Sequence, residues 1–328
     1  MVSVQINTQL LPTYQLVRSM NFGWEDQYVF DVTANSQYAI ASASDNMIRL
    51  YDLSTLQPAA SLNLHQQRIS KIKLFNDQYL FSASEDGKLA RWDLRASTTT
   101  PVQIFHYPRP LSAFDVNCND TMAVVGTLNE DVVQAAELGF FDTRQTQLIH
   151  KFEESHGDDV TEIQCHPTIP SQLISSSTDG LINSYDVSEF DEEEALLAVV
   201  NSGSSVNKAG YFGPNAEYLY CLTHLETFSI HTIEGDLMCD YGQLKQLDGV
   251  DYAIDCNYDP ISQRLYLETG NNNGSSLIFH VNIDELQLCQ TLHAPGGHTD
   301  VVRSIYWNHT TQSILTGGED GIMCAWQG

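Results

Sequence analysis

The segment from His156 to His166 holds the densest group of side chains that could bind a metal or transfer a proton. It contains two histidines, three carboxylates and one cysteine. The ligands of one metal ion must all lie within about 2 Å of it, whereas a β-strand extends by about 3.3 Å per residue. The segment between the two histidines is expected to contain a strand, which would place them too far apart. We therefore predict no metal site here.

Two glycine-containing segments could serve nucleophilic catalysis or phosphate binding. Gly203-Ser204-Ser205 lacks the G-x-S-x-G frame of a nucleophile elbow. Gly296-Gly297-His298 lacks the Lys-Ser/Thr pair and the following helix of a phosphate-binding loop. We therefore predict that the protein is not an enzyme, and that it has no catalytic residues and no cofactor.

The segment 297–328 contains polar residues of four kinds at spacings that suggest one buried network. They are a histidine near the start, a strand hydroxyl, an aspartate in a tight turn and a strand tryptophan, namely His298, Thr316, Asp320 and Trp326. Two earlier segments contain matching sets, which are His65, Ser82, Asp86 and Trp92, and His156, Ser175, Asp179 and Tyr185. Buried donors and acceptors need partners, and such a set supplies them while it fixes a loop to a sheet. We therefore assign all three sets to the architecture.

These sets resemble the WD repeat of the β-propeller family, and a narrower resemblance to one member of that family covers about 155–328. The resemblance implies an all-β fold of four-stranded antiparallel blades, with no established enzyme activity to carry over. The residues that close each candidate third strand recur at intervals of about 40–50 residues, which predicts seven blades. As a single domain over 1–328, the blades are approximately 24–62, 65–105, 106–152, 156–200, 204–240, 250–292 and 297–328.

The last of these blades has too little chain for a fourth strand, because the sequence ends soon after Trp326. The segment 13–20 precedes the first blade and has the length of a strand. We predict that it pairs with the C-terminal blade and closes the ring, which removes the open edges.

The negative charge is concentrated in one part of the chain. The net charge is −27, yet residues 1–109 contain nine Lys/Arg and nine Asp/Glu, so residues 110–328 carry all of it. A field of this sign repels nucleic acid and anionic membranes and attracts basic protein segments. We therefore expect a monomeric, non-enzymatic scaffold that binds a basic partner such as a ribosomal protein or a histone, and neither nucleic acid nor membrane directly.

Acidic residues at or before the first strands are the candidate partner-binding residues. They are Glu25, Asp26, Asp158, Asp159, Asp248, Asp251 and Asp300. In a propeller these loops share one face, so we expect their charges to gather there. The alternative is that acidic loops only keep the protein soluble.

Two Asp-x-Arg sequences suggest a different function. The segments ending in Arg95 and Arg144 are similar to the box by which substrate receptors dock on cullin-RING ubiquitin ligases. Such a sequence also forms a local ion pair at a strand end, which leaves the structural alternative open.

Regulation and location have weaker signals. Ser188 precedes a run of five carboxylates in the pattern Ser-x-x-acidic, which acidophilic kinases favour. Seven cysteines without a C-x-x-C pair, and no secretory signal, predict reduced thiols and a location in the cytoplasm or nucleus.

Overall fold

The structure is a computed structural model that describes residues 3–23, 27–96, 99–129 and 135–328. Its strands form seven sheets, and the fold class is the predicted one, an all-β, seven-bladed β-propeller with antiparallel blades. The chain divides into two compact units. One comprises Met1–Gln78, Leu94–Thr100 and Tyr241–Gly328, and the other comprises Tyr79–Asp93 and Pro101–Asp240.

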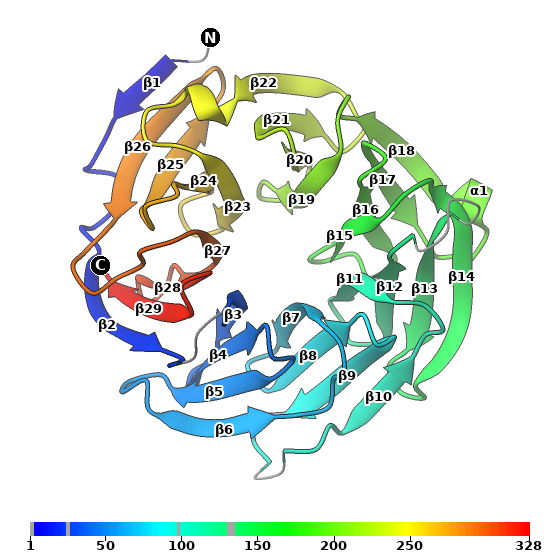
Figure 1. The fold of residues 1–328 in the computed structure, drawn as a ribbon. Helices are drawn as coiled ribbons and strands as arrows, with labels where there is room; N and C mark the ends of the chain where they lie inside the picture. Colours follow the sequence, from blue (N-terminus) through cyan, green and yellow to red (C-terminus); the bar gives the residue numbers. More distant parts are fainter. Residues whose placement is uncertain (1–2, 24–26, 97–98, 130–134) are drawn as a thin grey trace. The chain divides into compact units, whose positions relative to one another are not determined.

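The first unit contains three complete blades (Figure 1). The first blade consists of β3 (Val29–Ala34), β4 (Tyr38–Ala43), β5 (Ile48–Asp52) and β6 (Pro58–Leu62). The sixth contains β23 (Tyr252–Asp259), β24 (Arg264–Gly270), β25 (Ser276–Asn282) and β26 (Glu285–Leu292), and the 3-10 helix η1 (Leu244–Gln246) precedes it. The seventh contains β27 (Val302–Asn308), β28 (Ser313–Gly318), β29 (Ile322–Gln327) and β2 (Gln15–Asn21). The unit also holds β1 (Ser3–Ile6) and β7 (Ile69–Phe75).

The second unit contains the third and fourth blades and most of the second and fifth. Strands β8 (Tyr79–Ser84), β9 (Lys88–Asp93) and β10 (Gln103–His106) belong to the second. The third contains β11 (Leu111–Val116), β12 (Met122–Thr127), β13 (Ala136–Asp142) and β14 (Gln147–His156). The fourth contains β15 (Val160–Cys165), β16 (Gln172–Ser177), β17 (Leu181–Asp186) and β18 (Leu196–Asn201), with α1 (Glu192–Ala195) before β18. The fifth contains β19 (Val206–Phe212), β20 (Tyr218–Thr223), β21 (Thr227–Thr232) and β22 (Leu237–Gln243).

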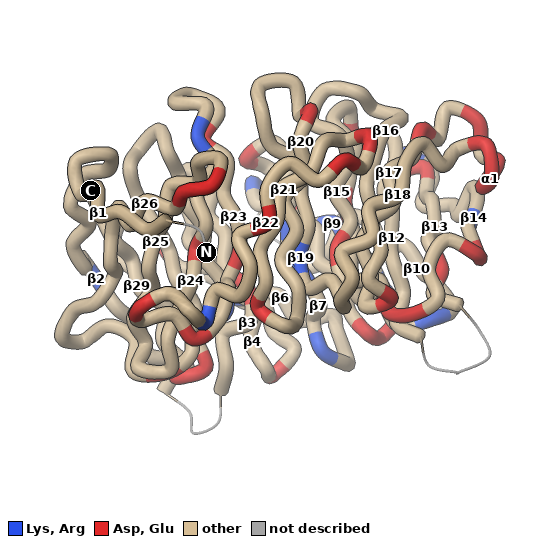
Figure 2. The backbone as a smooth tube through the Cα atoms, turned by 90° about the horizontal axis from the view of Figure 1, so that it is seen from above, with Lys and Arg blue, Asp and Glu red and all other residues tan. Residues whose placement is uncertain are grey.

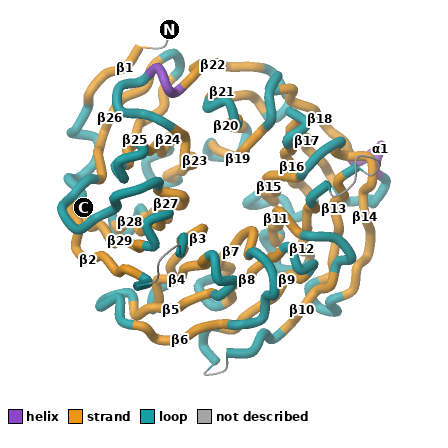
Figure 3. The backbone as a smooth tube through the Cα atoms, viewed as in Figure 1, coloured by secondary structure: helices purple, strands orange, loops and turns teal. Residues whose placement is uncertain are grey.

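In the described part of the chain, α1 and η1 are the only helical segments (Figure 3), and neither is long and apolar enough to cross a membrane.

The seventh blade is completed by the N-terminal segment, as predicted. Strand β2 pairs antiparallel with β29, from Gln15 opposite Gln327 to Asn21 opposite Ile322 (Figure 1). Each blade has four antiparallel strands, as predicted, and the sixth gains one more, because β1 pairs with the start of β26 in parallel register. The two N-terminal strands therefore join two neighbouring blades of the first unit.

Side chains at the first strands tie neighbouring blades together. In β3, β11, β15, β19, β23 and β27 a register shift near the start of the strand displaces one residue. Asp31 follows the shift in β3, and its carboxylate accepts hydrogen bonds from the Ser304 hydroxyl (2.9 Å) and the Ile72 amide (3.0 Å). In the second unit Asp115 accepts one from the Cys165 amide (2.8 Å). These contacts explain why such polar residues stand in otherwise apolar strands.

The cores lie between successive blades. In the first unit one core surrounds Tyr14, Tyr266, Trp307 and Trp326, and a second joins the seventh blade to the first around Val29 and Leu315. In the second unit one core joins the third blade to the fourth around Phe140 and Phe152, and another joins the fourth to the fifth around Ile182 and Val206. Each blade therefore depends on its neighbour for burial.

Tyr14 gives a test of how much the N-terminal segment stabilises the seventh blade. Its ring is 5 % exposed and packs edge-on against Trp307, and its hydroxyl accepts a hydrogen bond from the Trp307 indole N–H (2.9 Å). We expect Tyr14→Ala to lower the free energy of unfolding by about 3–5 kcal/mol. Tyr14→Phe keeps the ring and should cost about 1 kcal/mol. Urea denaturation followed by tryptophan fluorescence measures both.

Ile6→Ala is the control, because Ile6 lies in β1 and is 78 % exposed. It should change stability by less than about 0.5 kcal/mol. If Tyr14→Ala were as stable as the wild type, the N-terminal segment would not stabilise the blade.

Candidate functional site

The polar set of the seventh blade forms one connected network. The His298 ring bonds to Asp320 through Nδ1 (3.1 Å) and to the Thr316 hydroxyl through Nε2 (2.8 Å). The same hydroxyl oxygen accepts a hydrogen bond from the indole N–H of Trp326 (3.0 Å). His298, Thr316 and Trp326 are buried, so each polar atom of this set is matched inside the blade.

The fourth blade repeats this arrangement. His156 Nδ1 lies 3.2 Å from an Asp179 carboxylate oxygen, and its Nε2 lies 2.7 Å from the Ser175 hydroxyl. Tyr185 stands at the tryptophan position, and its hydroxyl accepts a hydrogen bond from the Asn183 amide group (3.1 Å).

The order Asp179–His156–Ser175 is that of a serine-hydrolase triad, but burial argues against that chemistry. Ser175 and His156 have 0 % and 1 % of their surface exposed. A nucleophile needs a substrate carbonyl within reach and donors for the developing oxyanion. This serine is therefore a hydrogen-bonded core residue in the folded state.

In the second blade the Trp92 indole N–H donates to the Ser82 hydroxyl (2.9 Å), and both side chains are buried. His65 is also buried. Asp86 accepts a hydrogen bond from the Lys88 backbone amide and forms an ion pair with the Lys88 ammonium (3.0 Å).

Asp320 is held in its ionised form. Burial alone would raise the pKa of its carboxyl group, but the hydrogen bond and charge of His298 oppose burial, together with the Thr299 and Ile322 amides. The net effect is a pKa below the ordinary value for aspartate. Asp179 has its pKa lowered in the same way, by His156 and the Gly157 and Leu181 amides against burial.

The predicted partner-binding acids of the first unit differ in exposure and in the hydrogen bonds that their carboxylates accept. Asp251 accepts a hydrogen bond from the Asn272 amide (2.8 Å) and is half-buried. Asp300 is exposed and accepts one from the Val301 amide (2.8 Å), and Asp248 is exposed. Asp251 and Asp300 lie at the same end of adjacent blades, because the Tyr252 hydroxyl accepts a hydrogen bond from the Val302 amide (2.8 Å).

In the second unit Asp158 is exposed, whereas Asp159 accepts a hydrogen bond from the Asn129 amide (2.6 Å) and is half-buried. Glu25 and Asp26 lie outside the described residues. That all seven acids gather on one face stays a prediction.

Sequence reasoning missed the contact that organises the acidic run after Ser188. The Glu192 carboxylate accepts hydrogen bonds from the Glu153 and Glu154 amides (2.8 and 2.9 Å) and from the Ser155 hydroxyl (2.6 Å), so it fixes α1 to β14. Asp191 caps α1 by accepting from the Glu193 and Glu194 amides. Glu193 and Glu194 are exposed, and Figure 2 shows the tube red along α1. Glu192 and the β14 residues that it contacts are almost 40 residues apart, so no local sequence pattern could have predicted this contact.

The two arginines predicted to dock on a ligase belong to different units. The Arg144 side chain is 70 % exposed and donates two hydrogen bonds to Asp142 (2.9 and 2.7 Å), which lower the pKa of that carboxyl group to about 2. The Asp-x-Arg sequence thus forms a local ion pair at the end of β13. Arg95 is exposed. Ser188 is exposed as well, and its hydroxyl donates to Asp186.

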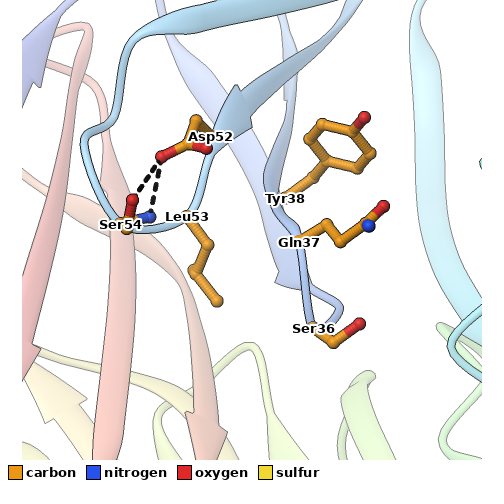
Figure 4. A pocket seen from close by; sticks show the side chains of 6 residues that line it. All are labelled: Ser36, Gln37, Tyr38, Asp52, Leu53 and Ser54. Carbon is orange, nitrogen blue, oxygen red and sulfur yellow. Dashed lines mark hydrogen bonds between the residues drawn. The ribbon is translucent and has the colours of Figure 1, made fainter.

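A shallow pocket of about 510 Å³ lies in the first blade between two turns, lined by Ser36, Gln37, Tyr38, Asp52, Leu53 and Ser54 (Figure 4). Asp52, its only charged residue, is already bonded to the amides and hydroxyls of Ser54 and Thr55. Among the described residues no three His, Cys, Asp or Glu side chains are grouped as a metal ion requires. The candidate sites that remain are therefore the polar networks within the blades and the exposed acidic residues.

The lowered pKa of Asp320 predicts a pH-dependent stability. A carboxyl group whose folded pKa is depressed stabilises the fold above its unfolded pKa, and the contribution is lost as the pH falls through the folded pKa. Asp320→Asn should therefore lower the free energy of unfolding by about 1–3 kcal/mol at neutral pH. The gap to the wild type should narrow below about pH 4, measured by urea denaturation across the pH range. Asp300→Asn, at an exposed acid nearby, is the control and should change little; a gap independent of pH would contradict the assignment.

The repeat and the chain as a whole have known relatives. The family described as WD domain, G-beta repeat matches residues 287–327. WD repeat-containing protein GTS1 of Arabidopsis thaliana is 30 % identical over 97 % of this chain and 86 % of its own length. WD repeat-containing protein 89 homolog of Dictyostelium discoideum is 28 % identical over 95 % of this chain and 89 % of its own. An uncharacterized WD repeat-containing protein of Saccharomyces cerevisiae is 26 % identical over 97 % and 82 %.

The narrower resemblance predicted for about 155–328 was to WD repeat-containing protein 89. It is confirmed, and it extends over nearly the whole chain. Together with the seven blades and the His–Thr–Trp network, these relatives place the chain in the WD-repeat protein family.

Proposed function

We propose that this protein is a non-enzymatic scaffold whose acidic surface binds a basic segment of a partner protein. WD-repeat propellers act generally as protein-interaction scaffolds, and this chain has their fold. The proposal adds the sign of the partner's charge and the part of the chain that receives it.

One observation carries the proposal: from the end of β14 through the fourth and fifth blades, the chain is almost free of basic residues. Residues 152–244 contain 17 Asp/Glu and a single Lys/Arg, which is Lys208. Ten of these carboxylates are exposed, namely Glu153, Glu154, Asp158, Glu189, Asp191, Glu193, Glu194, Glu234, Asp236 and Asp240. A surface that served only solubility would gain from mixed signs as well, so a one-signed surface favours a steering role.

Such a surface raises the local concentration of Lys/Arg-rich segments and holds them through charge-assisted hydrogen bonds. Ribosomal proteins and histones are the abundant proteins with segments of this kind. The same field repels nucleic acid and anionic lipid. We accordingly propose a monomer of the cytoplasm or nucleus that binds these basic proteins rather than their nucleic acids.

Binding should depend on salt and on the sign of the ligand. A fluorescent Lys/Arg-rich peptide from a histone tail should bind at low ionic strength and weaken at least about tenfold at high salt, measured by anisotropy. An acidic peptide of equal length should not bind. Glu193→Gln with Glu194→Gln should weaken binding more than Asp248→Asn with Asp300→Asn, which removes the same charge elsewhere. Absence of binding of the basic peptide at low salt would remove the proposal.

Ligase docking is a second candidate, favoured by one observation, the 70 % exposure of the Arg144 side chain. Against it stands the ion pair with Asp142. If Arg144 docks on a ligase, Arg144→Ala and Arg95→Ala should reduce recovery of cullin-RING components in a pull-down at least about fivefold. Lys151→Ala, an exposed cation nearby, should not. Equal recovery with all three variants would dismiss this function.

A further inference from the structure

Strand β18 is an exposed apolar edge within the acidic surface. It is the last strand of the fourth blade and pairs only with β17 among the described strands. Leu196, Leu197 and Val199 are 40 %, 54 % and 43 % exposed. The pairing shifts by one residue at Leu197, so this side chain sits at a bulge.

Edge strands normally carry a charge or a proline that prevents other chains from pairing with them. Four other strands that end a sheet follow this rule, since β2 contains Arg18, β14 contains Lys151, β22 contains Asp240 and β6 contains Pro58. Strand β18, with the sequence LLAVVN, contains neither a charge nor a proline. Its open edge therefore lacks the protection that those strands have.

The sixth blade shows that a last strand of this protein can accept another. There β1 adds to the open edge of β26, and Ser3 to Ile6 lie opposite Glu285 to Leu288. Strand β1 therefore covers the first half of β26, which follows the turn from β25. In β18 the turn at Gly235 approaches the end of the strand, where a Cβ on Gly235 would lie 3.1 Å from the Val199 carbonyl oxygen. The side chains from Leu196 to Val199 that remain exposed lie in the part of the strand that follows α1.

Carboxylates border this edge. Glu193 and Glu194 lie on α1, which leads directly into β18, and both are exposed. Glu234 and Asp236 flank Gly235 and are exposed as well. A segment lying along β18 would meet aliphatic side chains in the middle and carboxylates around them.

We propose that β18 is a docking edge for an extended segment of a partner protein in which aliphatic residues alternate with lysine or arginine. Side chains of a strand alternate between its two faces, so one set would pack on Leu197 and Val199 while the other reaches the carboxylates. This inference rests on the proposed function, and it adds where the partner binds and an apolar contact to the charged ones. A second copy of this chain is a poorer occupant, because pairing two β18 edges would bring two acidic α1 runs together.

Peptides that separate charge from apolar contact test the proposal. The probes are short labelled peptides of alternating valine and lysine, of alternating serine and lysine, and of alternating valine and glutamate. The valine–lysine peptide should bind about tenfold more tightly than the serine–lysine peptide, and the valine–glutamate peptide should not bind. Hydrogen exchange should show new protection at 196–201 when the valine–lysine peptide is bound.

Val199→Lys should abolish the tighter binding of the valine–lysine peptide relative to the serine–lysine peptide. Leu225→Lys is the matched control, because Leu225 is 61 % exposed in the turn between β20 and β21 and the change of charge is the same. Val199→Thr, which keeps the shape of the side chain, should weaken binding in the same direction if Val199→Lys does not fold.

Equal binding of the two lysine peptides, unaffected by Val199→Lys, would overturn the docking edge and leave the proposed function standing. Failure of both lysine peptides to bind would overturn the two together. A wild-type dimer that Val199→Lys converts to a monomer would show that the occupant is a second copy, which also overturns the proposal.

Discussion

The pairing of β2 with β29 is the interaction on which the first unit depends. Without it the seventh blade would end in an open edge at β29. Tyr14, just before β2, fills the core beside Trp307 and supplies the acceptor for its indole N–H. Strand β1, which precedes β2, pairs with the sixth blade as an additional strand. One short N-terminal segment thus completes the seventh sheet and extends the sixth, and the core between these blades depends on both because no blade buries its faces alone.

The parts of this architecture that rest on local spacing could be predicted from the sequence. The hydroxyl at Thr316, the turn at Asp320-Gly321 and the strand Trp326 have counterparts in two earlier segments, which indicated the repeat. The number of blades followed from the residues that close each third strand, which recur at intervals of about 40–50 residues. The parallel pairing of β1 could not be predicted, since Ser3 and Glu285 are far apart in the chain and four residues carry too weak a pattern. The shifts before Asp31 and Glu162 likewise depend on pairing geometry, which composition does not encode.

For the candidate surface the sequence indicated the negative charge but not which carboxylates accept hydrogen bonds within the fold. Asp159, Asp251 and Glu192 look alike in sequence to their exposed neighbours, yet each accepts hydrogen bonds from backbone amides elsewhere in the fold. An aspartate whose lone pairs are occupied by amides is a poorer ligand for a partner's cation than one facing water. Counting carboxylates therefore overestimates the binding surface, and exposed acids such as Asp248 and Glu193 are the ones that can receive a partner.

The exposed acids of α1 also explain how the uncharged edge of β18 can persist beside them. An aliphatic edge such as β18 would be a hazard in a neutral protein, because copies could pair through it. Here the exposed carboxylates of α1 border the strand, and they would oppose the approach of a second acidic chain with the same charges. A segment of opposite charge meets attraction at the same positions. Carboxylates beside an apolar edge can therefore do what a lysine within the strand does elsewhere, while they leave the edge open to one class of partner.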